Sequence, residues 1–339
     1  MKRNRLSGII RPLMLGLVCS LAVAGCGSTS PAGGGELEQV RMASWSQPIS
    51  EQTHLLSEPE YGWFAEAGID LEFIPGAGGG DAIKHLLSGQ ADIAFTDPGS
   101  LFFALDKGEA LVAIYNIYPQ NVFNVVALQE SGIQEPEDLR GKTIGVYSLA
   151  SGTRHNLLML LSAAGIEEDE VTIVETGVSN FLPLMQGQVD ATAATDTGLL
   201  IGLEKGLGNI NVMEVKDFLN MPSDLFVVTE EVFREKEALM RRFLQAYQAS
   251  AAWMLEQPEE AAELAIKHAI DGQDKGRNRA IIEARNAATV SELTESEGLG
   301  ALETEILQQA ADAYYELGLI ENRLDMESVI RDDLLPGRP

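Results

Sequence analysis

Short apolar runs and longer amphipathic stretches alternate along this chain. The short runs predict strands, and the longer stretches, with apolar residues three or four positions apart, predict helices with one buried face. The predicted strands cover residues 41–45, 70–75, 92–97, 111–115, 123–128, 143–147, 171–175, 190–196 and 225–228. After the last strand, predicted helices cover residues 237–256, 258–269, 276–288 and 302–316. This order is typical of an α/β protein with a helical tail.

One unit of this pattern occurs twice. Residues 67–92 and 164–190 share the order AGI, strand, glycine-bearing loop, amphipathic helix and GQxD, at an offset of 97 residues at AGI and 98 at GQxD. In each copy the helix is expected to stop at Gly89 or Gly187, and the next strand to begin at the aspartate. Two copies of one α/β unit predict two similar lobes, each with a mainly parallel sheet flanked by helices.

The helical tail is expected to pack back on the first lobe. This assigns residues 38–125 and 224–335 to lobe 1 and residues 126–223 to lobe 2. The chain then crosses between the lobes twice, near residues 123–127 and 222–225, and the crossings form a hinge. Because open α/β sheets bind ligands at the carboxyl ends of their strands, the expected ligand site is the cleft between the lobes.

The start of the chain has the pattern of an export signal. The first eleven residues include the basic residues Lys2, Arg3, Arg5 and Arg11, and residues 13–25 are apolar. Cys26 follows Val-Ala-Gly, as in bacterial lipoproteins whose cysteine is acylated and becomes the N-terminus after cleavage. We therefore predict a signal at residues 1–25, lipidation of Cys26 and a flexible Gly/Ser/Pro tether at residues 26–37. The anchor would hold the protein at the extracytoplasmic face of the cell membrane. An ordinary secretory signal with an incidental cysteine is the alternative.

Composition and charge exclude several classes of protein. The 339 residues include 24 Lys and Arg against 51 Asp and Glu, a net charge of −27, which disfavours nucleic acid as a partner. The only cysteines are Cys19 and Cys26, so the predicted mature domain has no free thiol for catalysis, a disulfide or a metal. The four histidines form no HExxH motif or close pair, and no nucleophile motif such as GxSxG is present. We expect no catalytic residue, no metal and no cofactor.

Three stretches resemble a known family. They are residues 61–101 (YGWFAEAGIDLEFIPGAGGGDAIKHLLSGQADIAFTDPGSL), 139–166 (LRGKTIGVYSLASGTRHNLLMLLSAAGI) and 181–196 (FLPLMQGQVDATAATD). The likeness, which runs from about residue 40 to residue 269, is to solute-binding proteins of ABC importers in the NMT1/THI5-like group. It implies the two-lobed type II fold of periplasmic binding proteins, closing on a small solute, with an ABC permease and its ATPase as partners. Members of this group are associated with sulfonates, taurine, nitrate, thiamine pyrimidine precursors and riboflavin.

The resemblance leaves two other classes of function open. The same family includes a yeast-type pyrimidine synthase with an active-site Lys and His and a Cys-rich motif. This chain lacks the cysteine cluster, and the neighbouring Lys84 and His85 point apart on their predicted helix. A lipoprotein that acts as a sensor or adhesion module would share the fold without a permease partner.

Loops at the predicted strand ends supply the candidate binding residues. The loops GAGGGD (residues 76–81) and SLASGT (residues 148–153) run directly into helices and offer backbone N–H groups, although simple helix entry would also explain their glycines. Aromatic residues gather at the same strand ends, as in a stacking pocket, with Phe95, Phe123 and Phe181 more readily interpreted as core. The predicted ligand-binding residues are Trp45, Ser46, Gly79, Thr96, Asp97, Tyr115, Asn116, Tyr147, Ser148, Ser151, Thr153 and Asp196.

These residues favour a flat heteroaromatic ligand. Asp97 and Asp196 are interpreted as equivalent ends of the repeated strand, where a carboxylate would accept ring N–H, amine or ribityl hydroxyl donors. A carboxylate would also repel a sulfonate or nitrate. The sole basic side chain in these loops is Arg154, so an anion remains the alternative. The sequence thus favours riboflavin or a thiamine pyrimidine precursor over an alkanesulfonate, taurine or nitrate.

Overall fold

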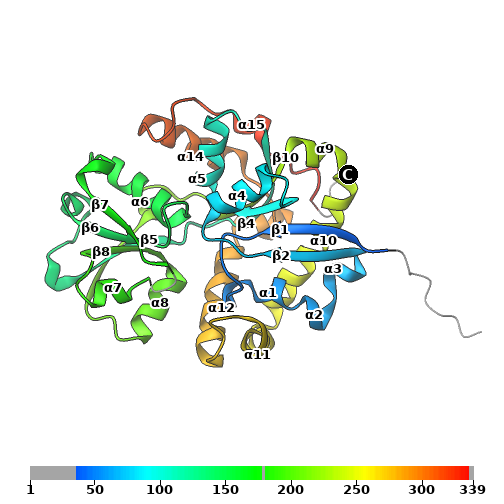
Figure 1. Ribbon diagram of the computed structural model, residues 1–339, viewed down its shortest axis with the longest axis horizontal. Coiled ribbons are helices and arrows are strands. Elements are labelled where there is room, and N and C mark those ends of the chain that lie inside the picture. Colours follow the sequence, from blue (N-terminus) through cyan, green and yellow to red (C-terminus); the bar gives the residue numbers. More distant parts are fainter. Residues whose placement is uncertain (1–35, 178–179, 336–339) are drawn as a thin grey trace, which may run out of the picture. The chain divides into compact units, whose positions relative to one another are not determined.

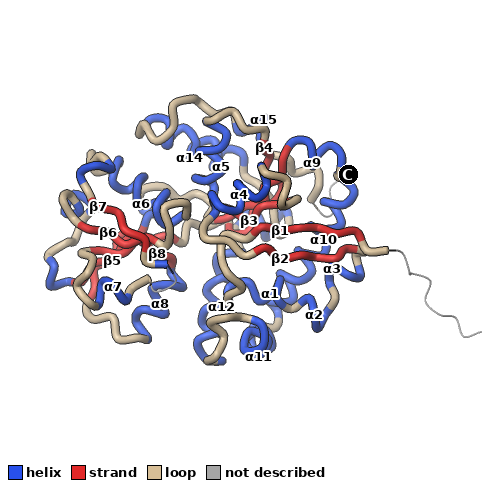
Figure 2. Tube along the Cα trace, viewed as in Figure 1, coloured by secondary structure: helices blue, strands red, loops and turns tan. Residues whose placement is uncertain are grey.

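The computed structural model describes residues 36–177 and 180–335. The predicted signal at residues 1–25 and the predicted lipidation site Cys26 lie outside this range. The described chain contains two five-stranded sheets, in the orders β2-β1-β3-β10-β4 and β7-β6-β8-β5-β9. Figure 2 shows the strands of the two sheets as separate groups, each flanked by helices. We call the sheets, with the helices that pack on them, the first and second lobes.

The first lobe contains the N-terminal elements and the helical tail (Figure 1). Its strands are β1 (Glu38–Ala43), β2 (Ile69–Ile74), β3 (Ile93–Thr96), β4 (Leu111–Tyr118) and β10 (Asp224–Thr229). Its helices before the crossing are η1 (Ser50–Gln52), α1 (Thr53–Leu56), α2 (Glu58–Tyr61), α3 (Trp63–Glu66), α4 (Gly79–Leu87) and α5 (Pro98–Asp106). The tail adds α9 (Glu230–Glu235), α10 (Glu237–Glu256), α11 (Pro258–His268), α12 (Lys275–Thr289), α13 (Glu292–Glu297), α14 (Thr304–Glu316) and α15 (Met326–Val329).

The second lobe is built from the middle of the chain, drawn in green in Figure 1. Its strands are β5 (Phe123–Leu128), β6 (Thr143–Val146), β7 (Thr172–Glu175), β8 (Ala191–Thr195) and β9 (Ile210–Glu214). Its helices are α6 (Gly152–Ala163), α7 (Leu182–Met185) and α8 (Asp196–Glu204), with short turns η2 (Gln129–Ser131), η3 (Pro136–Leu139), η4 (Glu168–Glu170) and η6 (Val215–Asp217). Alternate residues of β5 enter different cores, Val125 and Ala127 on one face of the sheet and Val126 on the other.

Both sheets are mainly parallel, as predicted, and each contains one reversed strand. In the first lobe β10 runs antiparallel to β3 and β4, and in the second lobe β5 runs antiparallel to β8 and β9. Each reversed strand is the first one that the chain enters after it crosses from the other lobe. The two sheets therefore have the same topology, and β10 and β5 are equivalent strands.

The position of the first crossing differs from the prediction. Residues 123–127 of β5 all pair with β8, so the whole strand belongs to the second sheet. The chain crosses before it, at residues 119–122, and the predicted lobe boundary after residue 125 falls inside the strand. The return crossing covers residues 215–223, and β10 begins at Asp224. An apolar run marks a strand but does not say which sheet the strand joins, and this explains the difference.

The sequence repeat corresponds to β2-α4-β3 in the first lobe and β7-α7-β8 in the second. Gly89 and Gly187 follow the two helices with positive φ angles of 70° and 66°, which glycine adopts without strain. The aspartate of GQxD also has the same role in both copies. Asp92 Oδ2 accepts the Arg41 backbone N–H at 3.0 Å, and Asp190 Oδ2 accepts the Thr143 backbone N–H at 2.8 Å. This aspartate therefore ties the repeated unit to the strand, β1 or β6, that pairs with both strands of the unit.

Candidate ligand-binding cleft

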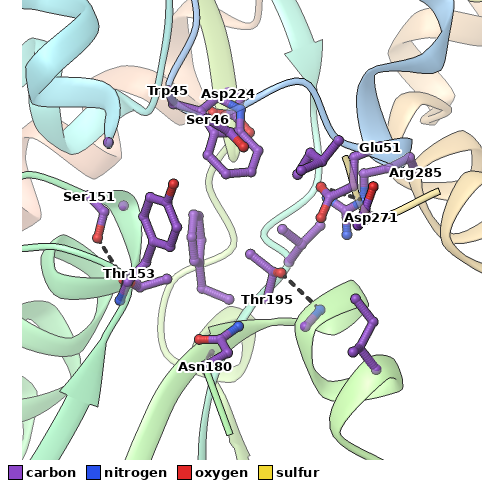
Figure 3. Close-up of a pocket in the computed structure, with 18 of the residues that line it drawn as sticks. Trp45, Ser46, Glu51, Ser151, Thr153, Asn180, Thr195, Asp224, Asp271 and Arg285 are labelled. Atoms are coloured by element: carbon purple, nitrogen blue, oxygen red, sulfur yellow. Dashed lines mark hydrogen bonds and ion pairs between the residues drawn. The ribbon is translucent and has the colours of Figure 1, made fainter. Parts of the chain in front are cut away.

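A cavity of about 500 Å³ lies between the two lobes and is lined by residues of both. This volume falls within the ~300–1,000 Å³ typical of sites for small organic ligands. The labelled side chains in Figure 3 come from distant parts of the chain and surround one space. The first lobe contributes Trp45, Ser46, Gly79, Asp97 and Asp224, among others, and the second contributes Phe123, Tyr147, Ser151, Thr153, Asn180 and Thr195.

Aromatic rings from both lobes line the cavity. Trp45 follows β1, and its ring meets the ring of Tyr147, which follows β6, edge to face with centroids 6.3 Å apart. Phe123, the first residue of β5, lines the cavity as well. A Cβ atom on Gly152 would lie 2.7 Å from Phe123 Cζ, so only glycine at the start of α6 leaves room for this ring. The Trp45 Nε1–H is buried and has no hydrogen-bond partner among the described residues.

The two glycine-bearing loops meet each other across the cleft. The Gly80 backbone N–H donates to the Ala150 carbonyl oxygen at 2.9 Å, and the Ser148 hydroxyl donates to the Ala77 carbonyl oxygen. At the start of α4, a Cβ on Gly79 would lie 2.6 Å from Thr96 Oγ1, too close for any other residue. Glycine is thus needed where α4 approaches the end of β3. The loops hold the lobes together at one rim of the cavity.

Asp97 is a residue of the first lobe that also contacts the second lobe. It caps the N-terminus of α5, where its carboxylate accepts the Ser100 backbone N–H at 2.9 Å and the Ser100 hydroxyl at 2.7 Å. The same carboxylate lies 2.8 Å from Nδ1 of His155, a buried residue of α6 in the second lobe. Burial alone would raise the pKa of Asp97, but the nearby His155 charge and these hydrogen bonds bring it below its usual value. Asp97 is therefore an ionised residue whose main partners are protein groups.

A second polar cluster joins the lobes at the opposite side of the cavity. Arg285 of α12 is 1% exposed, and its guanidinium forms ion pairs with Glu51 at 3.6 Å and with Asp196 at the start of α8. The Thr197 hydroxyl donates to Glu51 Oε1 at 2.6 Å. Glu51 and Arg285 belong to the first lobe, whereas Asp196 and Thr197 belong to the second. These contacts need the lobes to be close together.

Asp224 differs from the other acidic residues of the cavity. It is 7% exposed and lines the cavity, yet within residues 36–177 and 180–335 its carboxyl group has no hydrogen bond or ion pair. Burial, and then the negative charges of Asp97 and Glu51, raise its pKa well above the usual range. These surroundings favour the neutral form of the Asp224 carboxyl group, which has one O–H donor and one carbonyl acceptor.

Comparisons with known proteins agree with this geometry. Residues 50–261 match the model of a family described as NMT1/THI5 like. The chain belongs to the NMT1/THI5-like family. The riboflavin-binding protein RibY of Chloroflexus aurantiacus is similar to it, with 22% identity over 345 residues that cover 97% of this chain and 98% of that protein. The formylaminopyrimidine-binding protein of Halalkalibacterium halodurans is 25% identical over 250 residues, which cover 72% of this chain and 75% of that protein.

A solved structure of similar fold is that of the alkanesulfonate-binding protein SsuA from Xanthomonas axonopodis pv. citri bound to MOPS. It superposes with a TM-score of 0.67 and 16% identity, covering 88% of this chain and 100% of that chain. At this identity the likeness concerns the fold alone. The family resemblance and the two-lobed periplasmic-binding-protein fold predicted from the sequence are both confirmed.

Seven of the predicted site residues line the cavity of this family member. They are Trp45, Ser46, Gly79, Asp97, Tyr147, Ser151 and Thr153. They share a position in the turns at the carboxyl ends of β1, β3 and β6 or at the start of the helices that follow β2, β3 and β6.

The structure places the other five predicted residues elsewhere. Tyr115 is 1% exposed in the core of the first lobe, where its ring packs edge to face on Tyr247 with centroids 5.2 Å apart. Its neighbour Asn116 lies on the same strand, with its backbone N–H donating to the Gly300 carbonyl at 3.0 Å. Thr96 lies beneath Gly79, and Ser148 and Asp196 are engaged in the contacts between lobes described above. A side chain near the end of a strand therefore does not always reach the cavity. Tyr115 and Asn116 do not, because the helical tail covers β4.

The predicted equivalence of Asp97 and Asp196 is wrong by one residue. The aspartates of the two GQxD motifs are 98 positions apart, so the counterpart of Asp97 is Thr195. Thr195 indeed caps α8, its hydroxyl accepting the Gly198 backbone N–H at 3.2 Å, as Asp97 caps α5. Asp196 is the counterpart of Pro98, and these two residues are the first of α8 and α5. The repeat offset alone could have identified Thr195, which lines the cavity.

Other cavity residues had no signal in the sequence. They are Glu51 from η1, Asn180, Asp224 at the start of β10, and Asp271, Arg277 and Arg285 from the helical tail. The lining contains four acidic residues, Glu51, Asp97, Asp224 and Asp271, and three basic residues, Lys205, Arg277 and Arg285. Arg154, the predicted basic residue, is paired with Glu168 at 2.6 Å and is absent from the lining. The cavity therefore has no surplus of positive charge.

Of the helices within residues 36–177 and 180–335, none has the length and apolar character to span a bilayer. In the same part of the chain, no group of three or more His, Cys, Asp or Glu is arranged to hold a metal ion.

Proposed function

We propose that this chain is a solute-binding protein that holds a small, flat, uncharged heteroaromatic compound between its lobes. Riboflavin and the pyrimidine precursors of thiamine are the candidate ligands. The observation that carries the proposal is the cavity between the lobes, with rings of Trp45, Phe123 and Tyr147 in its lining and no surplus of cations. Flat rings stack on such side chains at little entropic cost. The names of the two similar proteins, which bind riboflavin and formylaminopyrimidine, point the same way.

Binding in this proposal is coupled to closure of the lobes. Direct contacts that cross the cleft include those between Gly80 and Ala150, between Asp97 and His155, and between Glu51 and Thr197. A ligand that touches both lobes stabilises the closed arrangement over an open one by its additional contacts. Closure also removes water from the ring faces, which strengthens the hydrogen bonds made inside the cavity. The closed form would be the one delivered to an ABC permease and its ATPase, from a lipid anchor at Cys26 on the extracytoplasmic face of the membrane.

The alternative ligand, a sulfonate, taurine or nitrate, finds less support in the cavity. Donors with positive charge hold an anion most strongly, and the guanidinium of Arg285 is already paired with two carboxylates, Glu51 and Asp196. Burying a further anion beside Asp97 would be opposed by charge repulsion. The resemblance to an alkanesulfonate-binding protein is a resemblance of fold.

An enzymatic function of the pyrimidine-synthase type is also less well supported. Neither Lys84 nor His85 lines the cavity, and His85 Nδ1 lies 2.8 Å from Gln90 Oε1 on the outer side of α4. Residues 36–177 and 180–335 contain no cysteine. A binding role needs none of these groups.

The test is a ligand screen of the purified protein against riboflavin, thiamine, its pyrimidine precursors, taurine, alkanesulfonates and nitrate. A ligand at 100 times its Kd stabilises the native state by about 2.7 kcal/mol, which raises the melting temperature by several degrees. We expect a shift with riboflavin or a pyrimidine precursor, accompanied by quenching of tryptophan fluorescence. The quenching should be lost in Trp45→Phe, because Trp63 and Trp253 lie in a separate cluster with Tyr61. A shift with sulfonate or nitrate only would refute the proposal.

A further inference from the structure

Asp224 occupies a special position in the fold. It is the first residue of β10, and Phe123 is the first residue of β5, the equivalent strand of the other lobe. Both residues line the cavity. Each reversed strand therefore begins at the cavity, immediately after the chain crosses between lobes, and contributes its first side chain. β5 contributes the aromatic ring of Phe123, and β10 contributes the carboxyl group of Asp224. Figure 3 shows Asp224 beside Trp45 and Ser46.

The carboxyl group of Asp224 has no partner within the protein. The residue is 7% exposed, and neither a hydrogen bond nor an ion pair is made by its side chain in the described part of the chain. A buried polar group without a partner costs about 1–3 kcal/mol, so such groups are rare unless something else satisfies them. The open side of this carboxyl group is the cavity.

The groups facing Asp224 favour its neutral form. The nearest charged residues are Asp97 at the end of β3 and Glu51 on η1, both acidic. Two buried phenols, Tyr118 of β4 and Tyr247 of α10, also interact with its charge. Arg285, a buried cation of the same cavity, stands 5.2 Å from the Tyr118 ring and is paired with Glu51 and Asp196 instead. Within residues 36–177 and 180–335, no cation forms an ion pair with Asp224.

We propose that Asp224 is a specificity-determining residue of the cleft, which as a neutral carboxylic acid pairs with an adjacent donor and acceptor on the edge of the bound ring. This inference rests on the proposed function. A carboxylic acid offers an O–H donor beside a carbonyl acceptor. It therefore forms a two-point hydrogen-bonded pair with an N–H next to a C=O, as in the dione edge of a flavin, or with a ring nitrogen next to an amine, as in an aminopyrimidine. Sulfonate and nitrate present acceptors only.

The test compares two substitutions with two ligands. Asp224→Asn keeps a donor beside an acceptor, whereas Asp224→Ala removes both. By titration of flavin fluorescence, we expect Asp224→Asn to bind riboflavin within about threefold of the unaltered protein, and Asp224→Ala to bind at least about tenfold more weakly. 3-Methylriboflavin, whose ring-edge donor is blocked, should bind the unaltered protein about tenfold more weakly and show no further loss in Asp224→Ala. The control Asp190→Asn, outside the cavity, should change neither affinity.

If the screen identifies an aminopyrimidine instead, the same design uses 4-amino-2-methylpyrimidine and its dimethylamino derivative. Thermal melting of the ligand-free variants shows whether they fold. If Asp224→Ala does not fold, the weaker binding of the methylated ligand to the unaltered protein still tests the hydrogen-bonded pair. Equal losses of ligand affinity in Asp224→Asn and Asp224→Ala would mean that Asp224 binds the ligand as an ionised carboxylate. Unchanged affinity in Asp224→Ala would mean that Asp224 does not contact the ligand. Either result overturns the inference while leaving the proposed function in place. Binding of no ring compound at all would refute the proposed function and this inference with it.

Discussion

Thr197 offers a way to measure lobe closure separately from ligand contact. Its hydroxyl is buried and donates to Glu51 Oε1 at 2.6 Å across the lobes, yet the residue does not line the cavity. Thr197→Val keeps the shape of the side chain and removes only the hydroxyl. The substitution therefore weakens the closed arrangement and alters no cavity-lining side chain, but it also removes the 3.0 Å contact between the Thr197 hydroxyl and the hydroxyl of Thr195, which lines the cavity.

The size of the effect follows from the type of hydrogen bond. A hydrogen bond to a charged group contributes about 1.5–3 kcal/mol, and the bond between Thr197 and Glu51 exists only when the lobes are together. If closure is required for tight binding, its loss lowers the population of the binding-competent form by the same free energy. The apparent Kd should then rise by about ten- to hundredfold.

Isothermal titration of the ligand found in the screen measures this change. Thr192→Val is a matched control, because Thr192 lies in the same lobe on β8 and its buried hydroxyl has no hydrogen-bond partner among the described residues. We expect the control to bind as the unaltered protein does. Small-angle scattering of Thr197→Val without ligand should show a larger mean radius. Equal affinities for Thr197→Val and Thr192→Val would show that this contact does not control closure.

Two further predictions concern the aromatic lining and the scaffold. Trp45→Ala should weaken ligand binding by at least about tenfold while the ligand-free protein still melts cooperatively, because the ring lines the cavity; unchanged affinity would exclude stacking on this residue. Burial tends to raise the pKa of Asp92, but Arg41 and Lys236 lower it from 3.8 to about 2. Asp92→Asn should therefore reduce the free energy of unfolding, measured by urea titration near pH 7, by about 2 kcal/mol. A lowered pKa stabilises the fold above pH 3.8, so the difference in the free energy of unfolding should shrink as the pH falls toward 2. Asp190→Asn should cost less, because the Asp190 carboxylate has no cationic partner in the described part of the chain.

The predictability of the fold varied with the kind of element. Apolar runs and the repeat predicted both lobes, and the glycines with positive φ at positions 89 and 187 marked the helix ends. Strand β9 (Ile210–Glu214) was not predicted, because it is an edge strand with partly exposed, mixed side chains and lacks a clear apolar run. The crossing before Phe123 was placed a few residues late for a similar reason, since local pattern carries no information on which sheet a strand joins.

The amino-acid sequence by itself determined the family, the duplicated α/β unit and the turns that reach the cavity from β1, β3 and β6. These depend on local chemistry: periodicity, glycine at tight approaches and helix entry directly after a strand. Only the tertiary structure decided that Tyr115 is core, and that Glu51, Asp224 and Arg285 lie at the cavity. Such residues are distant in the chain, and whether a side chain faces a cavity or a covering helix depends on the packing of the tail and the approach of the lobes. No local pattern encodes either.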